Sequence, residues 1–432
     1  MFLYIILISS FTFVCCKKSV EDNKYTDLRS TFTYVDKTPL IYEMLRHKYV
    51  FLSVPSKFGK TSNLDMINLF LGRHHSKQDV EHYFVFTKIW ESPEVVEAHM
   101  GKHPVVQFCL KLSGYSKDFE HTLSAFQVAL YNAFSDHVHL LESKKLTDEQ
   151  MRLMKLYTDY TKCRQMGTEM VAKGVSVLVE VLHKFHSKPV VLLADDFGAG
   201  ITDGILQNHV DLMQIVEFYS SFLNHTFANQ SLISHALFTA ENRLRGVAGD
   251  KLLDRVGFME KLEWSRFFGF TYAEAEHLLD KNVKNVTLKQ KKEVMKWYCG
   301  YSSYDGAFKI CNPYSIIEYI ARKEEKAHWS GSALSYGLLR TMSKEETLKE
   351  KLHELYWRRT VDMKVPDVNK TLDLSVLAKE VSETPDKCVD FLVETLLEAG
   401  FVTPADEQER PRNVILKFPN EEVRAVVLKL IE

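Results

Sequence analysis

Two groups of polar residues follow apolar runs and could act together on phosphate groups. Gly59, Lys60 and Thr61 follow the run 50–54 and begin a helical pattern that ends at Gly72. In a strand–loop–helix segment, backbone N–H groups and the positive end of the helix dipole face an anion. A lysine can then reach the outer phosphates of a nucleotide, and a threonine hydroxyl can hold Mg²⁺. The segment therefore predicts a phosphate-binding loop; the alternative is a helix start with a solvated lysine.

Two carboxylates, Asp195 and Asp196, end the apolar run 189–194. A continuous apolar run is typical of a central strand in a parallel sheet that is covered on both faces. Because the carboxyl ends of parallel strands meet at one edge, we expect both carboxylates near Lys60 and Thr61. In a P-loop nucleotidase, the strand-end aspartate holds Mg²⁺ and the next acidic residue orients the attacking water. The pattern favours a nucleotide site, although an aspartate pair can also simply cap the following loop.

Apolar runs alternate with amphipathic segments through the first part of the chain. The runs predict strands at 50–54, 104–110, 189–194 and 233–239. The amphipathic segments predict helices at 61–72, 118–141, 147–161, 167–183 and 210–224. This alternation is typical of an α/β fold with a parallel sheet, whose ligands bind at the carboxyl ends of the strands.

The composition sets limits on the class of protein. The chain has 432 residues, of which 45% are hydrophobic and 26% charged, so it can bury a large core and form two or three domains. A formal net charge of −2 gives no overall basis for binding nucleic acid. The seven cysteines lack the spacing of a zinc site.

The N-terminus has the character of a secretory signal. Residues 2–16 are apolar and uncharged, and Lys17 and Lys18 follow. The run has the length of a signal-peptide core and is short for a membrane span, so we expect cleavage; an uncleaved membrane anchor is the alternative. Four N-x-[ST] sequons agree with a secretory route and begin at Asn224, Asn229, Asn285 and Asn369.

Six separated motifs carry a resemblance to a known family. They lie at 34–41, 52–61, 192–197, 268–271, 297–301 and 312–315. Their order and spacing resemble those of the AAA-ATPase-like family, over about residues 27–430. The resemblance implies a P-loop (ASCE/AAA-type) parallel sheet flanked by helices, a helical lid and a small C-terminal domain. Many bacterial members carry a PD-(D/E)XK nuclease module at the C-terminus, which we expect to be absent here.

The resemblance also implies roles for individual residues. Phe58, Gly59, Lys60 and Thr61 would form the cofactor-binding loop, in which Gly59 allows close approach of the backbone and Lys60 contacts the β- and γ-phosphates. Thr61 and Asp195 would hold Mg²⁺. The family loop also lacks the first glycine of the pattern G-x-x-x-x-G-K-[ST], which is Val54 in this chain.

Further catalytic candidates follow the second carboxylate. Asp196 occupies the position of the family's catalytic glutamate, and Thr239 ends the next strand, where a residue that senses the γ-phosphate would lie. Arg243 and Arg245 follow and could neutralise charge in the transition state; the alternative is two solvated loop residues.

Three departures from the family pattern predict weak hydrolysis. The paired arginines of the family loop are Ser56 and Lys57 here, and an aspartate after the catalytic pair is Gly198. Asp196 is one methylene shorter than glutamate, and misplacing a water by about an ångström can cost roughly 100-fold in rate. These changes would affect hydrolysis more than nucleotide binding.

The C-terminal third predicts a hairpin and a small separate domain. Cys299 and Cys311 flank the turn at Asp305 and could form a cross-strand disulfide in a secretory compartment; otherwise they are two buried thiols. From about residue 346, a helix, two strands and a last helix resemble a winged helix. The turn between the strands has mixed charge, so we expect a structural or partner-docking module and no nucleic-acid binding.

Together these features predict four segments: a signal peptide (1–16), an AAA-ATPase-like P-loop domain (25–270), a helical lid region with a hairpin (271–345) and a winged-helix-like C-terminal domain (346–432). We expect a secreted glycoprotein that binds ATP and Mg²⁺ and hydrolyses ATP weakly, with a protein partner or a second copy. No stable membrane span would remain after cleavage; an uncleaved chain would be anchored by residues 2–16. The alternatives are a secreted pseudo-ATPase that binds protein without nucleotide, and an active intracellular ATPase.

Overall fold

The computed structural model describes residues 24–73, 77–110, 112, 118–206, 210–243, 252–329, 346–363, 393–405 and 414–431. The predicted signal peptide, Arg245 and the sequon at Asn369 lie outside these residues. Across the ranges that are described, no helix is both long and apolar enough to cross a membrane.

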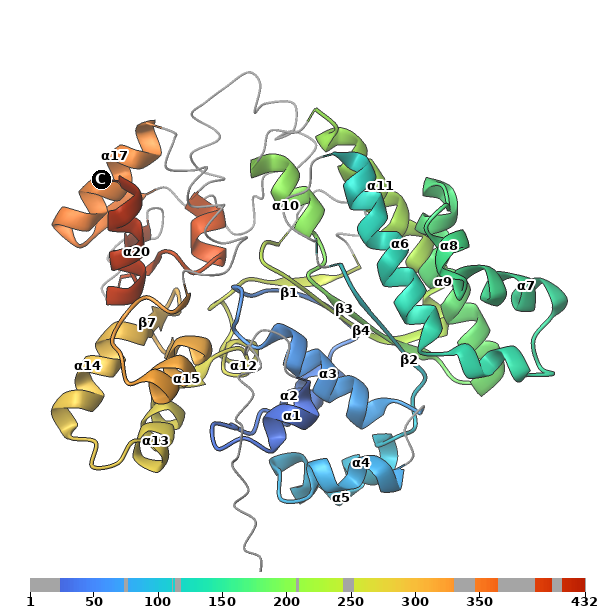
Figure 1. Ribbon diagram of the computed structural model, residues 1–432, viewed down its shortest axis with the longest axis horizontal. Coiled ribbons are helices and arrows are strands. Elements are labelled where there is room, and N and C mark those ends of the chain that lie inside the picture. The colour runs from blue at the N-terminus through green and yellow to red at the C-terminus, as the bar shows by residue number, and fades with distance from the viewer. Residues whose placement is uncertain are drawn as a thin grey trace, which may run out of the picture.

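A five-stranded parallel sheet lies between the helices of the first two thirds of the chain (Figure 1). Its strands are β1 (Tyr49–Ser53), β2 (Val105–Cys109), β3 (Val190–Asp195), β4 (Ile233–Ala240) and β5 (Asp254–Val256). Their order across the sheet is β2-β3-β4-β1-β5. The four strands that the apolar runs predict are confirmed, and β4 lies between the strand that precedes the phosphate loop and the strand that ends in the carboxylates.

Helices cover both faces of this sheet, which explains why β1 and β3 are buried along their whole length. One face packs against α1 (Tyr25–Arg29), α2 (Leu40–Arg46), α3 (Lys60–Leu71) and α12 (Leu262–Ser265). The other packs against α6 (Phe119–Ser135), α9 (Thr168–His186) and α11 (Leu212–Thr226). Figure 1 shows the two layers on opposite sides of the strands.

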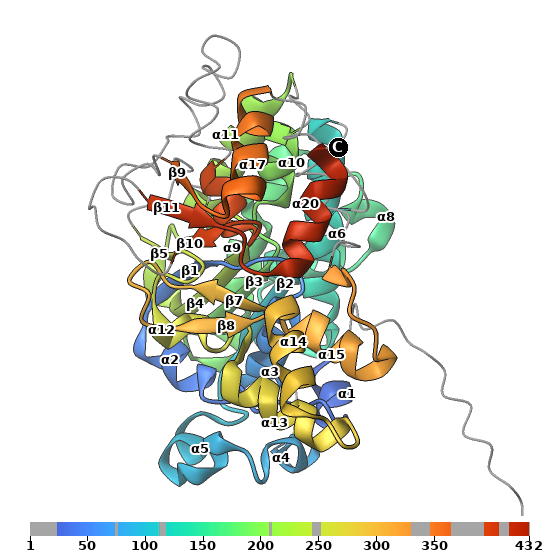
Figure 2. The same cartoon turned by 90° about the vertical axis from the view of Figure 1, so that its left-hand side faces the viewer.

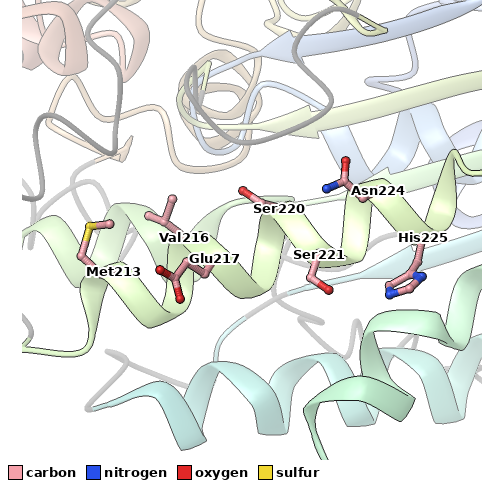
Figure 3. A pocket seen from close by; sticks show the side chains of 7 residues that line it. All are labelled: Met213, Val216, Glu217, Ser220, Ser221, Asn224 and His225. Atoms are coloured by element: carbon pink, nitrogen blue, oxygen red, sulfur yellow. The ribbon is translucent and has the colours of Figure 1, made fainter.

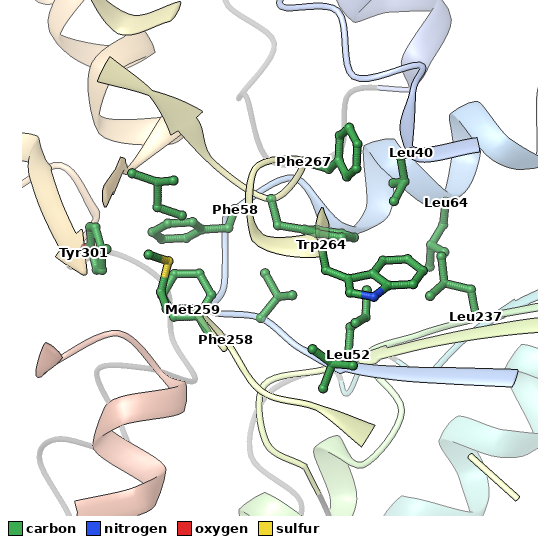
Figure 4. Packing of buried hydrophobic residues seen from close by; sticks show 14 of the residues in the cluster. Leu40, Leu52, Phe58, Leu64, Leu237, Phe258, Met259, Trp264, Phe267 and Tyr301 are labelled. Atoms are coloured by element: carbon green, nitrogen blue, oxygen red, sulfur yellow. The ribbon is translucent and has the colours of Figure 1, made fainter. Parts of the chain in front are cut away.

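Alternate side chains of each strand enter opposite cores, as the pleat requires. In β1, Val50 and Leu52 belong to the core on the α3 side, whereas Tyr49 and Phe51 belong to the core on the α9 side. The α3-side core also contains Trp264 and continues into the C-terminal elements (Figure 4).

Further helices complete this part of the chain. They are α4 (Lys77–Phe84), α5 (Pro93–His99), α7 (Asp148–Tyr157), α8 (Tyr160–Cys163) and α10 (Ala199–Leu206). The predicted helix 118–141 ends earlier, at Ser135, and a 3₁₀ turn follows over Val138–Glu142. The predicted helix 147–161 is divided, because Asp159 accepts a hydrogen bond from the Lys162 N–H and caps α8 separately.

The predicted hairpin belongs to a three-stranded antiparallel sheet. This sheet has the order β6 (Phe270–Thr271), β8 (Lys309–Cys311), β7 (Cys299–Ser302), and α13 (Tyr272–Asn282), α14 (Leu288–Tyr298) and α15 (Pro313–Arg322) pack around it. Cys299 and Cys311 pair across β7 and β8 and are joined by a disulfide, so the disulfide alternative holds. The Asn312 side chain accepts a hydrogen bond from the Ser315 N–H and starts α15, as its sequence predicts.

The C-terminal elements form a second small sheet, in which β10 lies next to β7 of the first antiparallel sheet (Figure 2). Its strands have the order β10 (Thr403–Pro404), β11 (Val414–Lys417), β9 (Val361–Met363). The helices α17 (Glu346–Arg358) and α20 (Glu421–Ile431) belong to the same part of the chain, and α17 contacts both α20 and β9. The two predicted strands correspond to β10 and β11, and the predicted last helix is α20. The winged-helix arrangement stays a prediction, because residues 364–392 lie outside the described ranges.

Candidate nucleotide-binding site

The loop between β1 and α3 has the backbone that its glycine predicts. Gly59 adopts a left-handed conformation with φ 87° and is the N-cap of α3, which begins at Lys60. A Cβ at Gly59 would meet only the Asn63 amide, at 3.9 Å, so there is room for a side chain. Glycine is favoured here because of the left-handed backbone conformation. The loop therefore delivers Lys60 and Thr61 in the first turn of the helix.

The Lys60 ammonium lies inside this loop. Its Nζ donates hydrogen bonds to the carbonyls of Val54 and Pro55, at 3.1 and 3.2 Å, and the residue is 6% exposed. Two carboxylates flank the same atom, Asp196 Oδ1 at 3.8 Å and Glu241 Oε1 at 3.9 Å. The lysine is therefore positioned by backbone carbonyls and has anionic groups on two sides.

Asp195 is the centre of a buried hydrogen-bond network. The hydroxyl of Thr61 donates to its Oδ2 at 2.5 Å, and the hydroxyl of Thr239 donates to its Oδ1 at 2.7 Å. The Asp196 N–H also donates to Oδ1, at 3.1 Å, and Asp195 itself is 1% exposed. The structure thus brings three predicted site residues together, with Thr61 from the first turn of α3 and Thr239 from the end of β4 both bonded to Asp195.

The oxygen atoms at this point suit a hard divalent cation. Asp195 Oδ2 and Thr61 Oγ1 are ligand types that Mg²⁺ accepts, and Thr61 is exposed. In the part of the chain that is described, a group with metal-ligand spacing is formed by Cys109, Asp195 and Asp196, whose ligand atoms lie within 4.8 Å of one another. Cys109 was not predicted; it ends β2, directly opposite Asp195 in the register. Mg²⁺ could therefore be held by Thr61 and Asp195.

Asp196 follows in a conformation that is uncommon for a residue with a side chain. Its φ is 51°, in the left-handed region, which aspartate tolerates better than most residues. The next N–H, of Phe197, donates to the Thr239 carbonyl at 2.8 Å and fixes this turn on β4. The Asp196 side chain is 27% exposed and faces Lys60.

Glu241, like Cys109, is a residue of the site that the sequence did not predict. Burial raises its pKa, the Lys60 ammonium opposes this rise, and the Asp195 carboxylate adds to it. One signal could have revealed it: Glu241 directly follows β4, and a strand that runs between β1 and β3 must end between the phosphate loop and the carboxylates.

Arg243 lies two residues further and contacts the C-terminal elements. Its guanidinium forms an ion pair with Glu398. A second ion pair joins Arg243 Nη1 to Glu260 Oε2 at 3.3 Å, and the Arg243 side chain is 4% exposed. The backbone N–H of Arg243 donates to Glu398 Oε2 at 2.7 Å. Burial raises the pKa of Glu398, which the Arg243 charge opposes. Gly257 leaves room for the guanidinium, because a Cβ there would lie 1.9 Å from Arg243 Nη2.

Phe58 and its neighbours anchor the phosphate loop to the rest of the molecule (Figure 4). The Phe58 ring packs edge-on against Phe258 and Tyr301, with centroids 5.2 and 5.1 Å apart, and it also contacts Trp329. The Trp329 indole N–H donates to the Ser56 carbonyl at 2.9 Å. The ring of Phe58 is therefore part of an aromatic core that joins the loop to Phe258, Tyr301 and Trp329.

A buried carboxylate, Glu422 at the start of α20, holds Trp329 in place. Glu422 Oε1 accepts hydrogen bonds from the N–H groups of His328 and Trp329, both at 2.7 Å, and the Ser315 hydroxyl donates to Oε2, also at 2.7 Å. Burial raises the pKa of Glu422 to about 7. The carboxyl thus connects the last helix, through Trp329, to the phosphate loop.

Replacing Glu422 with glutamine should make stability less dependent on pH. A buried carboxyl with a raised pKa binds its proton more tightly in the folded state, so stability falls as pH rises from 4.5 to about 7. Glutamine keeps the acceptor for both N–H groups and removes the charge. We expect E422Q to unfold at a higher temperature than the wild type at about pH 8 and at a similar temperature at about pH 5. The same change at the exposed Glu217 should shift neither value, and an E422Q effect that is equal at both pH values would contradict the account.

A separate hollow of about 500 Å³ lies along α11 and contains none of the site residues (Figure 3). It is lined by Met213, Val216, Glu217, Ser220, Ser221, Asn224 and His225. Asn224 begins a predicted sequon, and it is exposed, as are Asn229 and Asn285 of two other sequons. All three positions could therefore carry a glycan on the folded surface.

Comparison with known families agrees with the geometry at the strand ends. The model of a family described as a predicted AAA-ATPase matches residues 23–244, just over half of the chain, which include the phosphate loop, both carboxylates and all of β4. Among curated proteins, no match to this chain was found. On the extent of the family match, the chain belongs to the AAA-ATPase-like family.

Proposed function

We propose that this chain binds ATP with Mg²⁺ at the ends of β1, β3 and β4 and hydrolyses ATP slowly. The observation that carries the proposal is the direct hydrogen bond between Thr61, in the first turn after the phosphate loop, and Asp195 at the end of β3. Two motifs that are 134 residues apart in the sequence meet where a nucleotide-bound cation would be held.

Each residue in the loop has a distinct role in this proposal. Lys60 would exchange its contacts with loop carbonyls for the β- and γ-phosphates, and the N-terminus of α3 would face the same anion. Thr61 and Asp195 would hold Mg²⁺, which neutralises phosphate charge when it is bound. Thr239 keeps Asp195 oriented through its hydroxyl.

The charges at the site imply that nucleotide binding requires the cation. One ammonium, that of Lys60, lies among the carboxylates of Asp195, Asp196 and Glu241. ATP alone would add further negative charge to a site that is already anionic, whereas Mg²⁺ supplies two positive charges. We therefore infer that ATP without divalent cation binds poorly.

Slow hydrolysis is supported by the placement of Asp196 and Arg243. Asp196 is shorter than glutamate, has a left-handed backbone and faces Lys60 at 3.8 Å. Arg243 forms ion pairs with Glu398 and Glu260, on the side of the C-terminal elements. Both groups would have to rearrange before they could assist the transfer of a phosphoryl group.

We also propose a secretory location and the division of the chain at about residues 270 and 346. The Cys299–Cys311 disulfide supports the location, because disulfides persist in oxidising compartments. The exposed sequon asparagines are consistent with it. A second candidate is a pseudo-ATPase that binds a protein partner, and the ion pairs that engage Arg243 with Glu398 and Glu260 are consistent with it.

The test is the thermal stability of the protein with nucleotide. A ligand at 100 times its Kd stabilises the folded state by about 2.7 kcal/mol, so Mg·ATP should raise the unfolding temperature. ATP with EDTA, and Mg²⁺ alone, should raise it much less. The same unfolding temperature with and without millimolar Mg·ATP would contradict nucleotide binding and favour the pseudo-ATPase.

A further inference from the structure

The end of β4 is held between the two loops that form the site. The Val54 N–H, at the start of the phosphate loop, donates to the Ala240 carbonyl at 2.8 Å. On the other side of β4, the Phe197 N–H donates to the Thr239 carbonyl at 2.8 Å. The residue that follows β4, Glu241, is therefore fixed between the lysine and the two aspartates.

The side chain of Glu241 faces the ammonium that would bind the γ-phosphate. Its Oε1 lies 3.9 Å from Lys60 Nζ, and the side chain is 12% exposed. Asp196 Oδ1 lies 3.8 Å from the same nitrogen but belongs to a side chain that is 27% exposed. Glu241 is thus the more enclosed of the two carboxylates and is the longer by one methylene.

We propose that Glu241, and not Asp196, is the carboxylate that accepts the proton of the attacking water during ATP hydrolysis. The inference rests on the proposed function, since it requires a γ-phosphate at Lys60. The residue that follows β3 is the shorter Asp196, and the residue that follows the neighbouring strand β4 is a glutamate within reach of the same lysine.

The reaction balances with the groups that this site and its substrate provide. The water oxygen forms a bond to the γ-phosphorus, and the bond from that phosphorus to the β,γ-bridging oxygen breaks. ADP leaves with the electron pair of that bond. The proton of the water passes to a carboxylate oxygen of Glu241 and is released to solvent after phosphate leaves.

The experiment measures binding and hydrolysis separately on the full chain. Mg·ATP affinity is measured by calorimetry, and the hydrolysis rate is measured in single turnovers for the wild type, E241Q, E241D, D196N and E217Q. Loss of a general base costs about 100-fold or more in rate, so we expect that loss in E241Q with affinity at least as tight as in the wild type. E241D should recover part of the rate, D196N should lose less than E241Q, and E217Q on the surface of α11 should behave as the wild type.

Each other outcome overturns the inference in a distinguishable way. Hydrolysis by E241Q at the wild-type rate would show that Glu241 does not take the proton, and a larger loss in D196N would assign that role to Asp196. A wild type that binds Mg·ATP without hydrolysing it would overturn the inference and leave the binding proposal intact. No binding by the wild type would overturn both.

Discussion

Replacing Lys60 with alanine should remove saturable binding of Mg·ATP. The Lys60 ammonium is the cation between Asp196 and Glu241, so its loss leaves two carboxylates facing the phosphates without compensation. We expect affinity to fall at least about 100-fold, which corresponds to about 2.8 kcal/mol. Calorimetric titration of K60A beside the wild type measures the difference.

The matched control is K57A in the same loop. The Lys57 ammonium lies 4.1 Å from the centre of the Tyr314 ring, on α15, so it should contribute little to phosphate binding. An affinity change of about threefold or less is expected for K57A. Equal losses in K57A and K60A would show that loop charge, and not the position of Lys60, determines binding.

Replacing Arg243 with alanine should destabilise the protein strongly. Arg243 pairs with Glu398 while both side chains are 4% exposed, so the substitution leaves Glu398 buried without its partner. Breaking a buried ion pair in this way typically costs about 3–5 kcal/mol. The free energy of unfolding should fall by this amount, as measured by urea denaturation with tryptophan fluorescence, to which the buried Trp329 contributes.

Two further variants separate the cause from a general effect of losing an arginine. Arg152 and Glu149 form an exposed pair on α7, and R152A should cost less than about 1 kcal/mol. Adding E398Q to R243A removes the uncompensated charge and should recover part of the loss. If R243A were no less stable than R152A, Arg243 would not be a structural link to the C-terminal elements.

The main strands could be predicted because each is marked by a run of mostly apolar residues in its own sequence. β1 and β3 are continuous apolar runs, and a run that is buried on both faces has few alternatives. β5 (Asp254–Val256) escaped prediction because it is three residues long and contains Asp254 and Arg255. The position of β4 between β1 and β3 is a property of the whole sheet, and no local pattern specifies it.

The candidate site likewise contains one contact that the sequence predicts and others that depend on the whole fold. The contact between Thr61 and Asp195 was predictable, because Thr61 begins the helix after β1 and Asp195 ends β3, and both strands belong to one parallel sheet. Glu241 carries no motif of its own and gains its position only from the strand order. The partner of Arg243 is Glu398, 155 residues later in the sequence, and only the folded packing of the C-terminal elements brings the two together.

We propose that the ends of β1, β3 and β4 form a working site for Mg·ATP. Its most direct test is a calorimetric titration of the wild-type chain with ATP, once with Mg²⁺ and once with EDTA. We expect saturable binding of one nucleotide per chain that disappears with EDTA. The absence of binding at millimolar Mg·ATP would contradict it, and the fold would then serve as a protein-binding scaffold.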